Sequence, residues 1–312
     1  MKKIFKSFCE KEKDVPVFLT YNWFNSVFSD DEWDVVISKK GEEIVGIWPF
    51  LISKKMGFKK ILTPLMSPYQ GPWIKYPEEQ NDVNKKAFDK DIIGDLISQL
   101  PRFDEMRLNF HIGFRNWLPL YWNHFKETTR YTFVLKNITD HNNCFRGFKE
   151  SLRREISKAE KCLTIESFED IDFFYKKKCE YAKHTGANYK IPYERLIKVY
   201  NFIVSNKCGE MLAARDKDGN IHSIILYLMD NVSAYYLHGV TDSSFKTSGS
   251  MSLLLWESIK RSSKHVNMFN FEGSMNPSIE RYFRSFGGEQ IPYFEISKTN
   301  SNLLKLINFI SE

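Results

Sequence analysis

The sequence predicts an α/β protein of the α+β kind, in which two similar halves each hold a mixed, mainly antiparallel sheet flanked by helices. The chain has 312 residues, whereas single hydrophobic cores stop growing at roughly 250 to 300 residues. Its composition, 42% hydrophobic and 27% charged, is that of a globular protein. One order of elements occurs twice: a helix, an antiparallel hairpin, a further strand, a helix and a strand.

The first half begins with a helix expected at residues 17–28, followed by a hairpin. The hairpin strands are expected at 33–38 and 44–52, because β-branched runs flank the charged glycine turn 39–42. Pro and Gly residues then end regular structure in the loop 67–73. The other elements expected here are strands at 60–65, 106–111 and 131–135, a helix at 82–100 that Pro101 ends, and a short aromatic helix at 117–125.

The second half repeats the hairpin theme around the turn 216–220. Gly41 and Gly219 occupy matching turns about 180 residues apart, which favours duplication over the alternative that charged glycine turns are simply common. We therefore expect domains at residues 1–140 and 141–312, with the donor and acceptor cleft in the second. Its helices are expected at 144–161, 171–183, 193–205, 251–262, 278–286 and 303–310, and its strands at 163–167, 211–215, 221–229, 234–240, 266–271 and 293–297.

The cysteine count, the lengths of the apolar runs and the net charge argue against several classes of protein. The five cysteines are widely spaced without a Cys-x-x-Cys pair, which argues against a disulfide framework and against a metal site. No run approaches the roughly 18 apolar residues of a membrane helix, so we expect a cytoplasmic protein without a transmembrane segment. A net charge of +6 suits phosphate-bearing partners but falls short of a dedicated DNA binder.

Several segments together resemble a known family. Segments 151–161, 235–240, 252–257, 269–274 and 281–288 follow the order and spacing of the double-domain branch of the GNAT acetyltransferase superfamily, which includes the Fem-type peptidoglycan bridge-forming aminoacyltransferases and related bacterial acetyltransferase-like proteins. In the first half, residues 43–46 with Pro49 and the loop 69–72 resemble the same family. The resemblance implies two tandem GNAT-like domains that transfer an acyl group to a primary amine, from acyl-CoA or, in the Fem branch, from aminoacyl-tRNA.

A GNAT donor site holds the cofactor's phosphates on the backbone N–H groups that begin a helix. The segment that matches the family's Arg/Gln-x-x-Gly-x-Gly/Ala signature is 246–251, although Met251 replaces the last small residue. Lys246, Ser248, Gly249 and Ser250 are thus the expected contacts to acyl-CoA. The alternative is a polar loop that caps the next helix through Ser248 or Ser250.

Amine acylation needs a group that accepts a proton and a donor for the oxyanion or leaving group. Glu272, directly after a predicted strand, is the first candidate, with a capping carboxylate as the alternative. His238 is a candidate proton carrier and Tyr236 a candidate acid, expected on the same strand face because strand side chains alternate. The alternatives are a packed histidine and an aromatic wall. In the Fem branch catalysis relies on the substrate, so a base is not required.

Substrate contacts are expected on the basic helix and near the end of the chain. Arg153 and Arg284 suit an anionic acceptor, whereas pairs such as Glu150 with Arg154 are also typical of a solvated helix. Arg284 occupies the position where the Fem-like pattern has Lys, so a planar guanidinium group replaces a compact ammonium group. The complete set of expected substrate contacts is Arg153, Arg154, Arg284, Tyr69, Gln70 and Ser274.

These patterns predict an N-acyltransferase that uses an acyl-CoA-type thioester to acylate a primary amine of a cell-envelope precursor or sugar. The acceptor would be a small molecule or a lipid-linked or nucleotide-linked amine. One alternative is a tRNA-dependent aminoacyltransferase of peptidoglycan bridge formation, favoured by the basic helix and the degenerate donor loop. The other is a double-GNAT binding module without catalytic activity.

Overall fold

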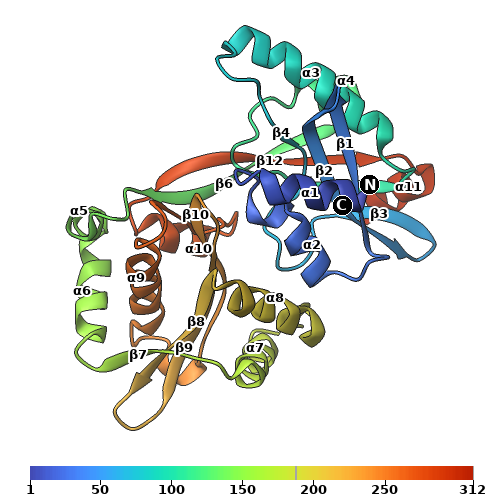
Figure 1. Cartoon of the computed structure of the whole chain (residues 1–312). Helices are drawn as coiled ribbons and strands as arrows, with labels where there is room; N and C mark the ends of the chain where they lie inside the picture. Colours follow the sequence, from blue (N-terminus) through green and yellow to red (C-terminus); the bar gives the residue numbers. More distant parts are fainter. Residues whose placement is uncertain (187, 312) are drawn as a thin grey trace. The chain divides into compact units, whose positions relative to one another are not determined.

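The computed structural model describes residues 1–186 and 188–311, which form two compact units (Figure 1). The first unit comprises Met1–Arg130 and Pro292–Glu312, and the second comprises Tyr131–Ile291. The expected boundary after residue 140 left residues 292–312 in the second half. The structure assigns them to the first unit because β12 (Glu289–Thr299) pairs antiparallel with β5 (Glu105–Asn109), so that Thr299 faces Glu105.

The first unit is built on a sheet with the strand order β1–β2–β3–β5–β12. All neighbours pair antiparallel except β3 and β5, which are parallel. A core of Trp48, Phe50, Phe88 and Phe110 lies under α3. The elements, besides β5 and β12, are α1 (Lys2–Lys11), a 3-10 turn (Val17–Leu19), α2 (Tyr21–Val27), β1 (Trp33–Lys40), β2 (Glu43–Lys55), β3 (Phe58–Leu62), β4 (Trp73–Ile74), α3 (Asp82–Gln99), α4 (Leu118–Trp122) and α11 (Asn302–Ser311).

Two local features of this unit differ from the sequence expectation. The predicted helix at 17–28 divides at Thr20, whose Oγ1 accepts a hydrogen bond from the Trp23 N–H and so caps α2. Strand β2 continues to Lys55 and turns through Met56 and Gly57 into β3, which gives a second hairpin. Residues 53–59, which lie between the predicted strands 44–52 and 60–65, thus extend both strands and form a tight turn.

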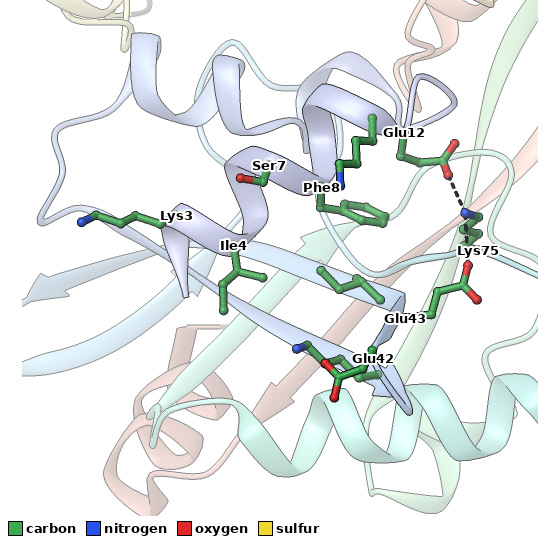
Figure 2. A pocket seen from close by; sticks show the side chains of 11 residues that line it. Lys3, Ile4, Ser7, Phe8, Glu12, Glu42, Glu43 and Lys75 are labelled. Carbon is green, nitrogen blue, oxygen red and sulfur yellow. Dashed lines mark ion pairs between the residues drawn. The ribbon is translucent and has the colours of Figure 1, made fainter.

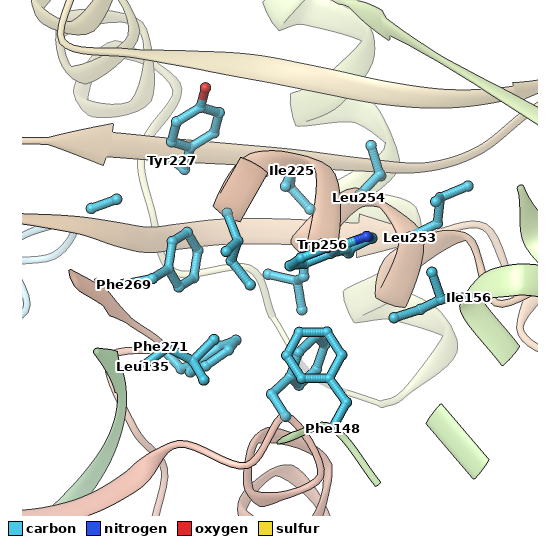
Figure 3. Packing of buried hydrophobic residues seen from close by; sticks show 14 of the residues in the cluster. Leu135, Phe148, Ile156, Ile225, Tyr227, Leu253, Leu254, Trp256, Phe269 and Phe271 are labelled. Carbon is cyan, nitrogen blue, oxygen red and sulfur yellow. The ribbon is translucent and has the colours of Figure 1, made fainter. Parts of the chain in front are cut away.

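The second unit has the strand order β6–β11–β10–β9–β8–β7. Its core is aromatic, with Trp256 of α9 packed against Phe148, and Phe269 and Phe271 on the sheet side (Figure 3). The elements are β6 (Lys126–Lys136), α5 (His141–Gly147), α6 (Glu150–Ala159), β7 (Leu163–Ser167), α7 (Ile171–His184), α8 (Tyr193–Asn206), β8 (Gly209–Asp216), β9 (Ile221–Met229), β10 (Ser233–Thr241), a 3-10 turn (Ser243–Phe245), α9 (Ser250–Ser262), β11 (Met268–Asn270) and α10 (Pro277–Arg284).

The single basic helix expected at 144–161 is instead the pair α5 and α6. The break occurs because Phe148 is buried against Phe286, 5.1 Å between ring centroids, and the Lys149 N–H donates to the Ser285 carbonyl rather than to its own helix. Tertiary packing therefore decides this boundary. Both units carry mainly antiparallel sheets flanked by helices, so the expected fold class is confirmed.

The parallel strands β10 and β11 pair over only three residues, from Ser233 with Met268 to Tyr235 with Asn270. Beyond that point β10 continues to Thr241 along β9, whereas β11 ends and the chain turns away. The pairing of β10 with β11 therefore stops at Tyr235 and Asn270, a point that we call the opening, and the candidate residues Tyr236 and Glu272 follow it closely. No helix of the described chain has both the length and the apolar character that crossing a bilayer requires.

Candidate acyl-transfer site

Glu272 lies at the end of β11 in a backbone conformation that is rare for its residue type. Its φ is +59°, in the left-handed region, and Gly273 follows with φ +61°. A Cβ on Gly273 would lie 2.3 Å from the Tyr131 carbonyl oxygen, so the backbone passes very close to β6. The buried Asn270 holds this turn, since its Oδ1 accepts from the Glu272 N–H and from the Thr132 hydroxyl. Neighbouring structure thus stabilises the strained conformation, which typically occurs at functional sites.

Glu272 is partly exposed as a residue, but one oxygen of its carboxyl group is shielded from water. Its Oε1 is buried and finds no hydrogen-bond partner among the described residues. Burial raises the pKa of this carboxyl well above its ordinary value, and the negative charge of Asp230 acts in the same direction. Glu272 is therefore a protonated acid over a range in which an exposed glutamate is ionised. This state suits a hydrogen-bond or proton donor, whereas the sequence expectation included a carboxylate base.

Tyr236 lines the aromatic wall beside the opening. Its ring packs edge-on against Phe283, 5.9 Å between centroids, and Phe283 stacks on Phe271, the residue before Glu272. A Cβ on Gly239 would lie 2.6 Å from the Tyr236 hydroxyl, so the glycine makes room for that group. Burial raises the pKa of Tyr236 above its ordinary value, which keeps the phenol neutral. Tyr236 can therefore wall the site or donate a hydrogen bond.

His238 does not share a strand face with Tyr236, contrary to the expectation from simple alternation. Tyr236 faces Tyr227 and His238 faces Leu226, which leaves Leu237 as an extra residue in a β-bulge. Because Tyr227 and Leu226 point to opposite faces of β9, their partners do too. The contacts agree, since Tyr236 meets Phe283 of α10 while His238 meets Phe174 of α7.

The surroundings of His238 favour a packed, neutral imidazole. Its Nε2 lies 2.8 Å from the Tyr189 hydroxyl, and the two rings stack with 5.5 Å between centroids. Burial lowers the pKa of His238 to about 3, and the nearby Lys178 ammonium acts in the same direction. Burial also lowers the pKa of Lys178 to about 8, and its Nζ donates to the Gly239 carbonyl at 2.9 Å. His238 is therefore a weak base at neutral pH.

The serine hydroxyls of the expected donor loop, residues 246–251, form hydrogen bonds within the chain. Ser250 is buried, and its hydroxyl meets those of Ser223 at 2.6 Å and Ser248 at 2.9 Å. Gly249, with φ +74°, approaches α6, because a Cβ there would lie 2.9 Å from Glu155 Cγ. The Ser248 hydroxyl accepts from the Ser250 N–H at 3.3 Å, at the start of α9, as the capping alternative expected, and the Lys246 side chain is exposed. The close approach that Gly249 allows is thus to another helix of the same unit.

A carboxylate lies at the start of α9, where a GNAT donor's phosphates are expected. Glu155 of α6 accepts a hydrogen bond from the Ser252 hydroxyl through its Oε1, at 2.7 Å. That hydroxyl also lies 2.9 Å from the hydroxyl of Tyr282. An anion at a helix N-terminus is stabilised by the unpaired N–H groups and the macrodipole. No local pattern in the sequence points to Glu155, because its partner is 97 residues away.

The three candidate arginines differ in their environments. Arg154 pairs with Glu150 on the exposed side of α6. Arg284 pairs with Glu280 at 2.7 Å and is also well exposed. Arg153 is half-buried, and its Nε is buried without a hydrogen-bond partner among the described residues. Leaving a buried guanidinium N–H without a hydrogen-bond partner costs free energy. An anionic ligand would supply that partner, so Arg153 is the arginine best placed to bind one.

The remaining expected contacts have mainly structural environments. The Ser274 hydroxyl accepts from the Asn276 N–H at 3.1 Å and so shapes the turn before α10. In the first unit, Tyr69 is buried edge-on against Phe18, 5.1 Å between centroids. Gln70 beside it is fully buried, and both polar atoms of its side chain lack a hydrogen-bond partner within the described part of the chain. Among these residues, only Gln70 has polar groups that a ligand would complete.

A groove of about 600 Å³ lies on the first unit between α1 and the β1–β2 hairpin (Figure 2). One of its lysines, Lys75, pairs with Glu12 at 3.2 Å and with Glu43 at 3.3 Å. Hydrogen bonds to these carboxylates raise the pKa of Lys75. None of the expected site residues line this groove.

No protein-family model matches this sequence, and no curated protein matches it. Solved structures do match over nearly the whole chain. The structure of FemX aligns with a TM-score of 0.68 at 10% identity and covers 98% of this chain and 98% of its own. L-PGS from Bacillus licheniformis aligns with a TM-score of 0.56 at 9% identity, covering 99% and 95%. A tandem GNAT protein from the clavulanic acid biosynthesis pathway aligns with a TM-score of 0.53 at 9% identity, covering 96% and 94%.

At sequence identities of 9 to 10%, these matches show a similar fold and nothing about the reaction. The tandem GNAT architecture that the sequence segments suggested is thereby confirmed. The fold places the opening between β10 and β11 in the sheet of a GNAT-like unit, whereas the reaction must be argued from the residues around it.

Proposed function

We propose that this protein is an acyltransferase that moves an acyl or aminoacyl group onto a primary amine, with the chemistry in the second unit at the opening between β10 and β11. The observation that carries the proposal is Glu272, a left-handed non-glycine residue whose buried carboxyl oxygen lacks a partner among the described residues. An apolar residue or a glycine would be more stable at this position. Function is the reason that best accounts for an acid there.

In the proposed reaction the amine nitrogen attacks the carbonyl carbon, a C–N bond forms, and the bond to the leaving oxygen or sulfur breaks. The protonated carboxyl of Glu272 hydrogen-bonds the carbonyl oxygen or gives its proton to the leaving group, and regains a proton from the attacking amine. Tyr236, Phe271 and Phe283 exclude water from this side. Exclusion of water strengthens the hydrogen bond from Glu272 and limits hydrolysis of the donor.

The donor that suits the second unit best is an aminoacyl ester of the kind that aminoacyl-tRNA provides. The carboxylate of Glu155 already lies at the first turn of α9, beside Ser252. A pyrophosphate placed there would meet like charge. The loop 246–251 keeps one glycine of the CoA signature, so acyl-CoA is the second candidate donor. It requires the Glu155 side chain to move away.

The acceptor is proposed to be an amine that carries phosphate, such as a nucleotide-linked or lipid-linked cell-envelope precursor or an amino sugar derivative. Arg153 supports this assignment, because its buried Nε has no hydrogen-bond partner among the described residues. A phosphate oxygen is a strong partner for a guanidinium N–H. The mildly basic chain, at net charge +6, favours the approach of such a substrate.

The test is a transfer assay with purified full-length protein, a panel of labelled aminoacyl-tRNAs and acyl-CoA thioesters, and amine acceptors with and without phosphate. We expect product with an aminoacyl-tRNA, and a loss of about 10² to 10⁴ in kcat for Glu272→Gln, which keeps the shape but cannot give up a proton. Glu280→Gln, on the exposed side of α10, is the matched control and should retain activity.

If only acyl-CoA supports turnover, the donor is acyl-CoA and not an aminoacyl ester. Unchanged kcat in Glu272→Gln, with the variant folded as judged by its melting curve, would remove Glu272 from the chemistry. The absence of transfer with every donor, together with tight binding of one of them, would favour the binding module instead.

A further inference from the structure

The tip of the β2–β3 hairpin carries an exposed apolar side chain between lysines. The tip sequence is Lys-Lys-Met-Gly-Phe-Lys-Lys at 54–60, and Met56 is 88% exposed. Met56 and Gly57 have φ of +51° and +81°, as in a two-residue type I′ turn. Asn, Asp or Gly is favoured at both positions, and an unbranched apolar residue gains nothing from a left-handed backbone in water. Methionine here therefore calls for an explanation outside the folded unit.

The α11 helix adds a second exposed apolar surface. Leu304 faces inward and is buried, whereas Phe309 is 79% exposed and Ile310 is 74% exposed. Leu303 and Leu306 are also more than half exposed. Lys305 is the only charged side chain in Asn302–Ser311. Such a helix leaves most of its apolar surface in water. Isolated soluble proteins rarely expose large apolar patches.

Asp104 joins the base of the hairpin to the start of α11. Its carboxylate accepts from the Lys59 N–H at 2.8 Å, and its own N–H donates to the Lys59 carbonyl at 2.8 Å. Its carbonyl accepts from the N–H groups of Asn300 and Ser301, at 2.8 Å and 3.3 Å. Both apolar features therefore lie at the same end of the first unit, and Figure 1 shows α11 beside β3.

More cationic groups lie between these two features. A groove of about 420 Å³ is lined by Lys59, Arg102 and Lys298 together with Leu100 and Phe103. Lys54, Lys55 and Lys59 are exposed, whereas Lys60 pairs with Glu105 at 2.6 Å. Apolar residues surrounded by lysines are typical of surfaces that lie in the headgroup region of a bilayer, where the apolar groups enter and the cations meet anionic lipids.

We propose that the β2–β3 hairpin tip and α11 form a membrane-docking surface that binds an anionic lipid bilayer peripherally. A second copy of this chain fits the surface less well, because a symmetric contact would bring the two sets of hairpin lysines together. The bilayer satisfies both parts at once, since it offers hydrocarbon to Met56 and Phe309 and negative charge to the lysines. The proposal stands independently of the transfer chemistry.

The experiment is flotation of the full chain with vesicles that contain about one-third phosphatidylglycerol, compared with vesicles of phosphatidylcholine alone. We expect binding to the anionic vesicles and little to the neutral ones. Lys54→Glu with Lys55→Glu should weaken binding by more than about 25-fold, because each lysine near an anionic surface contributes about fivefold. Lys158→Glu with Lys264→Glu, exposed lysines of the second unit, is the charge-matched control and should bind nearly as the wild type.

Two further variants separate loss of binding from loss of folding. Met56→Asn puts a residue that favours the left-handed turn at the tip, so it should keep or raise the melting temperature while binding falls about tenfold. Phe309→Asp, at an exposed position, should do the same to binding. Equal binding to both kinds of vesicle, or full binding by Met56→Asn and the Lys54 and Lys55 double variant, would overturn the proposal. So would a dimer, seen by light scattering without vesicle binding, that Phe309→Asp dissociates.

Discussion

Glu155 and Glu272 belong to the same unit, yet their surroundings give the two carboxyl groups opposite properties. Glu155 lies on an exposed helix face and accepts a hydrogen bond from the Ser252 hydroxyl at the start of α9. Glu272 is only partly exposed, and its buried Oε1 has no partner among the described residues. Glu155 accepts a hydrogen bond at a helix N-terminus, whereas burial raises the pKa of Glu272 and favours its neutral acid form. The role of a carboxyl group in this protein therefore follows from what lies around it.

The largest effect that would test this comparison is on how the free energy of unfolding depends on pH. Because the pKa of Glu272 is raised in the folded state, its stabilising contribution is complete below the pKa of the unfolded chain, near 4.3, and is lost as pH rises through the folded pKa. Wild type should lose about 1.4 kcal/mol of unfolding free energy per pH unit relative to Glu272→Gln within that window. Urea denaturation at several pH values measures it, and parallel curves for the two proteins would contradict a buried neutral acid.

A second effect sharpens the role of Glu155. Glu155→Gln keeps the hydrogen bond from Ser252 and removes the negative charge at the first turn of α9. We expect affinity for CoA, measured by isothermal titration calorimetry, to rise about tenfold, a change of about 1.4 kcal/mol. Glu160→Gln, exposed at the end of the same helix, is the control. If CoA binds wild type and variant equally, the carboxylate does not exclude phosphates.

A third prediction separates stability from function at one residue. Glu272→Gly removes both the strained left-handed side chain and the unpaired buried carboxyl, so the unfolding free energy should rise by about 1 kcal/mol or more. Transfer activity should be lost in the same protein. Thermal unfolding together with the transfer assay measures both. A less stable variant would mean that the Glu272 side chain supports the fold rather than the reaction.

The smallest effects are expected at the exposed ion pairs. Arg154→Ala and Arg284→Ala each remove one i,i+4 pair on a helix surface, and stability should change by no more than about 0.5 kcal/mol. Arg153→Ala should leave stability nearly as it is or increase it, while KM for a phosphate-bearing acceptor rises. An equal rise in KM for Arg284→Ala would extend the acceptor site to α10.

Much of the fold follows from local sequence patterns. The hairpins around 39–42 and 216–220 are where charged glycine turns and β-branched runs place them, and Glu272 does follow a strand. These features depend on residues close together in the chain. The order and spacing of the segments that resemble GNAT proteins also predicted the architecture that the solved structures share.

The features that the sequence did not reveal depend on tertiary contacts. The bulge at Leu237 turns His238 to the opposite face, and nothing in a run of apolar residues shows where an extra residue will sit. The break between α5 and α6 comes from the contact of Phe148 with Phe286. Glu155 reaches Ser252 only after α6 and α9 have packed. In each case a partner far along the chain decides the outcome.

Strand β12 also bears on how the chain folds during synthesis. The edge of β5 stays uncovered until residues 295–299, which come much later in the chain, have been synthesised. Until then the first unit has an uncovered strand and an incomplete hydrophobic layer, although most of its residues are already made. Such an edge is prone to pair with other chains. Because the whole second unit lies between β5 and residues 295–299 of β12 in the chain, the edge of β5 needs protection until that unit has been made.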